Sequence, residues 1–191
     1  MNYFKDSFGD PTDEPFLFGV IVSGEYHHTD IHWNTSGNGR LRIQYYFSRV
    51  KKTKGKKVDY EDIPRVHMIL DYHRENNNNY YYSELWNFFH TWSVKLETEG
   101  VEPLIYDSLD IDEHNRIVFK GNDATSIMNL FAYGTDVTVR AMAKDSSSQD
   151  SYSFIIDSET IKDLQEVLAG YRYHYFEYLK QHDEKTKSDN K

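Results

Sequence analysis

The chain has 191 residues, a formal net charge of −9 and an aromatic share of 16%. This length suffices for one domain with a full hydrophobic core, and the aromatic share is too high for a disordered chain. Cysteine is absent, which excludes disulfides, thiolate zinc sites and cysteine nucleophiles. The sequence shows neither a secretory leader pattern nor an apolar run of membrane-spanning length, so we expect a soluble, cytoplasmic protein with no membrane contact.

The order of predicted elements defines the expected domain organisation. We expect a polar N-terminal segment over residues 1–14, a single compact domain over 15–182 and a polar tail over 183–191. The domain divides into two similar halves, 15–100 and 101–182, in each of which strands precede a helix. The predicted fold class is therefore α+β, with mainly antiparallel sheets and two long helices.

The first half begins with a continuously apolar run over residues 16–22, which is typical of a strand covered on both faces. Further strands are predicted near 28–34, 40–50 and 65–73. Apolar residues then recur at helical spacing behind Ser83, a suitable N-cap. We therefore expect the first helix over residues 83–97, ending by Gly100.

In the second half, strands are predicted near 103–111, 116–120, 126–133, 137–144 and 152–156. The second helix is expected over 158–180, with Asp157 or Ser158 accepting hydrogen bonds from the first-turn amides. Its apolar stripe comprises Ile161, Leu164, Val167, Leu168, Tyr171, Tyr175 and Tyr178. Because Tyr173 and Phe176 project from the other side, the last turns need a second cover. Either loops of the same chain or a second copy in a homodimer would supply it.

The end of the chain resembles a known group of proteins. The strand at 152–156, the polar cap from Asp157 to Glu159 and the stripe of Ile161, Leu164 and Leu168 are similar to the closing strand, cap and amphipathic helix of the whirly and positive-cofactor group of single-strand-binding proteins. The doubled order of strands and helix also resembles whirly proteins. This resemblance implies sheets with basic and aromatic faces that bind single-stranded DNA, and helices that build an oligomer. It transfers no binding residue, since the glycine-and-lysine motif of whirly proteins is missing.

Positive charge is concentrated in one segment of the chain. Residues 40–57 contain no acid and eight of the 22 Lys and Arg residues, which leaves 14 basic residues against 31 acidic ones elsewhere. A basic segment that also contains aromatic residues is typical of a polyanion-binding surface. The predicted nucleic-acid-binding residues are Arg40, Arg42, Gln44, Tyr46, Arg49, Lys51, Lys52, Lys54, Lys56 and Lys57.

Strand alternation divides this segment into two rows of side chains. The core row comprises Leu41, Ile43, Tyr45 and Phe47, and the exposed row contains Arg40, Arg42, Gln44 and Tyr46. A three-residue loop at 37–39 would pair Ile31 with Tyr45 and Trp33 with Ile43, whereas a two-residue loop would mix the rows. We therefore expect the three-residue hairpin, which places His28, Asp30 and His32 on the exposed face beside Arg42.

These observations favour a non-enzymatic protein that needs no cofactor and binds single-stranded nucleic acid. Basic side chains would follow the phosphates, and Tyr46 would stack on a base. The alternative for the same segment is a solvated hairpin tip whose lysines keep a sheet edge from pairing with other chains.

Two other functions stay open. The acidic remainder, which includes Asp107, Asp110, Asp112, Glu113 and Asp123, is compatible with an inhibitor or immunity-type protein that occupies a basic groove on a protein partner. A metal-dependent enzyme would use His28, Asp30 and His32, because the His-x-Asp unit resembles part of the two-histidine, one-carboxylate triad of double-stranded β-helix oxygenases. The third ligand would then come from His67, His73 or His90.

Overall fold

A computed structural model describes residues 2–5, 11–30, 34–54, 57–73, 80–81, 91–109, 111–112, 116–144 and 148–188. Its elements are β1 (Asn2–Lys5), β2 (Pro11–Asp30), β3 (Asn34–Lys54), β4 (Lys57–His73), β5 (Tyr80–Tyr81), β6 (Trp92–Thr98), β7 (Leu104–Leu109), β8 (Ile117–Lys120), α1 (Asn122–Phe131), β9 (Val137–Lys144), β10 (Ser148–Ile156) and α2 (Ser158–Ser188). The predicted class, α+β with mainly antiparallel strands, is confirmed. Of the two helices in the described residues α2 is long, whereas α1 has ten residues.

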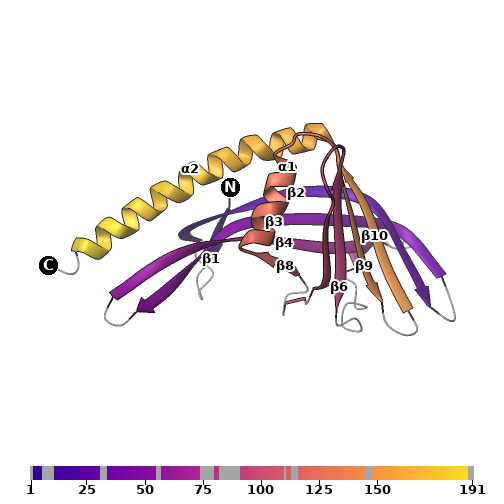
Figure 1. Cartoon of the computed structure of the whole chain (residues 1–191), viewed down its shortest axis with the longest axis horizontal. Helices are drawn as coiled ribbons and strands as arrows, with labels where there is room; N and C mark the ends of the chain where they lie inside the picture. Colours follow the sequence, from indigo (N-terminus) through magenta and orange to yellow (C-terminus); the bar gives the residue numbers. More distant parts are fainter. Residues whose placement is uncertain are drawn as a thin grey trace.

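All strands belong to one ten-stranded sheet with the order β5-β4-β3-β2-β10-β9-β6-β7, in which β1 also pairs with β2 and β8 also pairs with β4. Figure 1 shows the long strands β2, β3 and β4 crossing the molecule and curving at one end, where β10, β9 and β6 stand. Two contacts show that the two ends of the sheet approach each other. Ile111, after β7, forms a bridge with Ile117 of β8, and the ring centroids of Tyr106 and Phe119 lie 5.0 Å apart.

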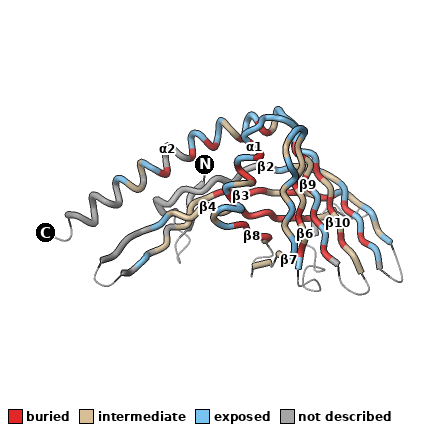
Figure 2. The backbone as a smooth tube through the Cα atoms, in the orientation of Figure 1, coloured by how far each residue is buried: buried red, intermediate tan, exposed pale blue. Residues whose placement is uncertain are grey.

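The core fills the inside of this curved sheet. Buried residues alternate with more exposed ones along β6, β9 and β10, as Figure 2 shows, because successive side chains of a strand point to opposite faces. The largest fully buried side chains are Trp92, Tyr26, Tyr152, Tyr171, Tyr175, Phe119, Phe131, Phe154, Leu41 and Met68. Helices α1 and α2 contribute Ile127 and Ile161 to the same core.

The helix expected over 83–97 is wrong for its second half, because residues 92–98 form strand β6. Trp92 and Leu96 are four residues apart, a spacing that suits one face of a helix and one face of a strand equally. Val94 decides between them, since Trp92, Val94 and Leu96 are all buried and β6 pairs with both β7 and β9. The first part of the expected helix, 83–90, lies outside the described residues.

The strand expected over 126–133 is also wrong, because helix α1 occupies most of this range. Ala124, Ile127, Met128 and Phe131 are buried, which is the spacing of one helical face. Gly121 precedes the helix with a φ of 59°, a left-handed conformation that favours glycine. Its carbonyl oxygen accepts a hydrogen bond from the Thr125 amide.

The predicted loop at 37–39 is wrong as well, because these residues lie inside β3 and pair with β2, Gly39 opposite Gly24. Glycine serves close packing here, since a β-carbon at Gly39 would lie 3.0 Å from the Tyr152 ring. Tyr45 pairs with Leu17 and Val66, and Ile43 pairs with Met68. Ile31 and Trp33 lie outside the described residues.

Helix α2 begins where the sequence predicts. The Asp157 carboxylate accepts a hydrogen bond from the Thr160 amide at 2.7 Å, and this contact lowers the pKa of Asp157. The stripe residues Ile161, Leu164, Leu168, Tyr171 and Tyr175 are buried, but Val167 is 47% exposed. The Tyr178 side chain lies outside the described residues.

Strands β3 and β4 supply cover for part of α2. The Tyr171 hydroxyl accepts a hydrogen bond from the Phe47 amide at 3.1 Å. The Tyr175 hydroxyl donates to Asp62 of β4 at 2.8 Å. Within the described part of the chain, neither helix is both long and apolar enough to cross a membrane.

Candidate functional site

The side of the sheet opposite the core, here called the outer face, collects polar and basic side chains from strands that are distant in sequence. The register of the strands places the following residues on it: Ile105, Lys95, Arg140, Ser153, Glu25, Arg40, Arg42, Gln44, Tyr46, Arg65, His67 and Lys120. The predicted core row is confirmed for Leu41, Ile43 and Tyr45, which are buried on the opposite side.

Arg40 and Arg42 share one buried carboxylate on the neighbouring strand. Asp71 is 1% exposed and accepts hydrogen bonds from Arg40 Nη2 at 2.9 Å and from Arg42 Nη2 at 3.2 Å. The two guanidinium groups therefore share the negative charge of Asp71. Arg42 lies on the predicted face but is only 16% exposed, so it is more buried than a member of the predicted exposed row should be.

A second group, in which one carboxylate again binds two cations, lies on the neighbouring strands β6 and β9. Glu97 binds Lys95 Nζ at 2.6 Å and Arg140 Nη1 at 3.2 Å, and the bond from Lys95 lowers the pKa of this carboxyl. The group of Lys95, Arg140 and Glu97 therefore has one positive charge in excess. The group therefore adds a second site of positive charge to the outer face.

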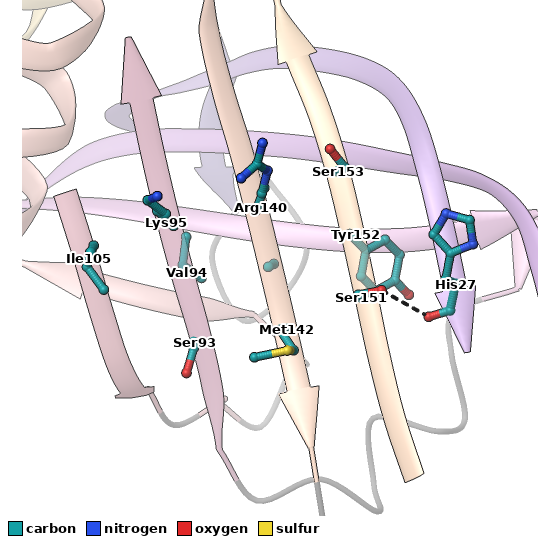
Figure 3. Close-up of a pocket in the computed structure, with 11 residues that line it drawn as sticks. His27, Ser93, Val94, Lys95, Ile105, Arg140, Met142, Ser151, Tyr152 and Ser153 are labelled. Carbon is teal, nitrogen blue, oxygen red and sulfur yellow. Dashed lines mark hydrogen bonds between the residues drawn. The ribbon is translucent and has the colours of Figure 1, made fainter. Parts of the chain in front are cut away.

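Beside this group the outer face is hollowed into a shallow groove of about 340 Å³. Figure 3 shows Lys95 and Arg140 on adjacent strands above Met142, with Ile105 on one side and His27 on the other. Ile105 is 61% exposed and Met142 41% exposed, so the groove combines apolar surface with two cations. Ser93, Ser151 and Ser153 also line the groove.

Tyr46, Arg65, His67 and Lys120 form a third group. The Tyr46 hydroxyl lies 3.0 Å from His67 Nε2, and the register places Tyr46 beside Arg65 and Arg65 beside Lys120. Burial is the first cause that lowers the pKa of His67 to about 4, and Arg116, Arg65 and Lys120 act in the same direction. The imidazole is therefore neutral at pH 7.

The remaining residues of the predicted site lie on the projecting end of the β3–β4 hairpin. Register places Arg49 opposite Asp62, Lys51 opposite Tyr60 and Lys52 opposite Asp59. The Lys52 ammonium group forms an ion pair with Glu61. Acidic residues of β4 thus face part of the basic segment, whereas Lys54 and Lys57 oppose each other at the hairpin end. Lys56 lies outside the described residues.

The expectation that His28 lies on the exposed face is wrong. Its side chain is 4% exposed, and Nδ1 lies 2.7 Å from Asp150, which also accepts a hydrogen bond from the Tyr26 hydroxyl. Burial raises the pKa of Asp150 against these contacts. The Asp30 side chain and His32 lie outside the described residues, within which no group of three or more His, Cys, Asp or Glu residues is arranged to hold a metal.

The sequence-based site omitted several outer-face residues. Arg65 and His67 fall in the predicted strand 65–73, and Lys120 ends the predicted strand 116–120. Alternation along each strand alone would therefore have identified a row of outward-facing side chains. Their place beside Tyr46 depends on the β3–β4 and β4–β8 registers. Comparison of the chain with protein-family models, with curated proteins and with solved structures returned no match.

Proposed function

We propose that this protein is a non-enzymatic binding protein whose outer face takes up single-stranded nucleic acid. The observation that supports this proposal most is the concentration of cations on the outer face of a chain with a net charge of −9. Each of the two carboxylates, Asp71 and Glu97, is shared by two cations. Arg65 and Lys120 add further positive charge without an ion-pair partner among the described residues.

In this proposal the cations contact successive phosphates, and Tyr46 offers a partly exposed ring to a base. A single strand suits the fold better than a duplex, because readout of the major groove commonly uses a basic helix. Helix α1 contains no Lys or Arg, and the first turn of α2 carries Glu159.

The proposal is tested by fluorescence anisotropy with a labelled oligothymidylate over a series of salt concentrations. The double variant Lys95→Gln, Arg140→Gln should bind more weakly than the unmodified protein. Its log–log salt slope should fall by about 0.7 for each lost phosphate contact. Lys162→Gln removes one positive charge from the exposed side of α2, against two in the double variant; it serves as the control and should leave the log–log salt slope unchanged.

Two outcomes contradict the proposal. One is the absence of binding to both DNA and RNA single strands at low salt. The other is an equal loss of affinity in the outer-face variant and in Lys162→Gln, which would mean that only net charge matters. Either result would redirect attention to a protein partner for the acidic remainder of the chain.

A further inference from the structure

Two polar atoms on the outer face of β4 are buried without a hydrogen-bond partner. These are Nδ1 of His67 and Nε of Arg65, which make no hydrogen bond within the described part of the chain. His67 itself is 3% exposed. Buried polar groups in native proteins are nearly always satisfied, so an unpaired pair on one face indicates a missing partner.

The Tyr46 contact indicates what kind of partner is missing. A tyrosine hydroxyl keeps its proton at neutral pH and can donate it to Nε2 of His67, which lies 3.0 Å away. In that arrangement the neutral imidazole carries its proton on Nδ1. Both unpaired atoms, Nδ1 of His67 and Nε of Arg65, are then N–H donors that require an acceptor.

The surrounding charges indicate that the acceptor is an anion. Arg65 pairs in register with Lys120, and both cations, with Arg116, disfavour protonation of His67. Asp112 acts in the opposite direction on His67, and it is bound to Arg116 Nη2 at 2.7 Å. Positive charge therefore remains in excess around the two donors.

We propose that Arg65, His67 and Lys120 form a subsite for one phosphate group, which accepts hydrogen bonds from His67 Nδ1–H and Arg65 Nε–H while Lys120 contributes charge. Residues two apart on a strand lie about 7 Å from each other on the same face, a separation that the long arginine side chain bridges. A phosphate suits these donors because its several oxygens accept from more than one N–H group. This inference depends on the proposed function in one respect only, which is that the phosphate group belongs to a nucleic-acid backbone.

The subsite is tested by following the His67 imidazole by ¹⁵N NMR during titration with inorganic phosphate and, separately, with oligothymidylate. Phosphate should move the Nδ1 resonance and raise the pKa of His67 from about 4, because a bound anion favours the imidazolium form. This titration uses the unmodified protein, so the groups that act on the His67 ring are all present. They are Tyr46, Arg65, Arg116, Asp112 and Lys120.

Two variants separate the subsite from the rest of the outer face. Arg65→Gln and Lys120→Gln should each abolish the phosphate response of His67 and weaken oligothymidylate binding by about tenfold. Lys120 is exposed, so Lys120→Gln tests the subsite even where Arg65→Gln disturbs folding. Lys162→Gln on α2 should keep the phosphate response of His67.

The results distinguish the subsite from the proposed function. An unchanged His67 spectrum at saturating phosphate, together with normal oligothymidylate binding by Lys120→Gln, overturns the subsite and leaves the function standing. A phosphate response that both variants abolish, without any oligothymidylate binding, supports the subsite and overturns the function. In that case free phosphate or a small phosphorylated molecule is the ligand.

Discussion

At the residue scale, the buried carboxylate of Asp71 changes what Arg42 is expected to do. A fully solvated arginine would be dispensable for folding, whereas Arg42 holds a group that is 1% exposed. Arg42→Ala should therefore lower the free energy of unfolding by roughly 1–3 kcal/mol, with Arg40 limiting the loss because it still binds Asp71. Urea denaturation measures the effect.

Arg140→Ala is the matched control for this prediction. Arg140 is 60% exposed and binds the partly exposed carboxylate of Glu97, so its removal should change the free energy of unfolding by less than about 0.5 kcal/mol. Equal losses in the two variants would contradict the structural role of Arg42.

The two rows of β3 could be predicted from the sequence, but their partners could not. Alternation is a local property, and it correctly separates Leu41 and Ile43 from Arg40 and Arg42. Asp71 also falls in a predicted strand. The contact between Asp71 and the arginines depends on the pairing of β3 with β4, which the sequence pattern alone does not specify.

At the element scale, the prediction failed where one spacing suits two structures. Trp92 and Leu96 fit a helical face and a strand face, and the strand was decided by long-range pairing with β7 and β9. Helix α2 could be predicted because its cap and its stripe are both local signals. The N-cap region of α1 offered no such signal, since its N-cap is Gly121 without a side-chain hydrogen bond.

The close packing of β2, β3 and β10 depends on two glycines that pair in register, Gly24 and Gly39. A β-carbon at Gly24 would overlap the Ser153 carbonyl oxygen and lie 2.5 Å from the Phe154 ring. Because backbone would have to move, Gly24→Ala should destabilise the protein by roughly 1–3 kcal/mol in thermal or urea unfolding. The same change at Gly170, inside α2 with nothing within 4 Å, should stabilise it by about 0.4–1 kcal/mol. A neutral Gly24→Ala would indicate that these strands pack differently.

At the scale of the whole molecule, the sheet divides the charge of the protein. The outer face gathers the shared cations around Asp71 and Glu97, whereas the exposed side of α2 carries Glu159, Asp163 and Glu166. In the sequence, the basic segment 40–57 appears as a separate positive strip. In the fold, Glu61 and register partners on β4 offset part of that strip, and the outer face draws its charge from strands throughout the chain.

This division predicts how the protein approaches a polyanion. Net charge acts over about a Debye length and governs the rate of encounter, whereas contacts at the interface govern the rate of dissociation. Replacing Asp163 and Glu166 with Asn and Gln should therefore speed association with oligothymidylate at low salt and leave dissociation unchanged. Stopped-flow fluorescence measures both rates. The gain should disappear at high salt, because screening removes the repulsion that these acids exert. A change confined to the dissociation rate would place α2 at the interface and contradict binding through the outer face.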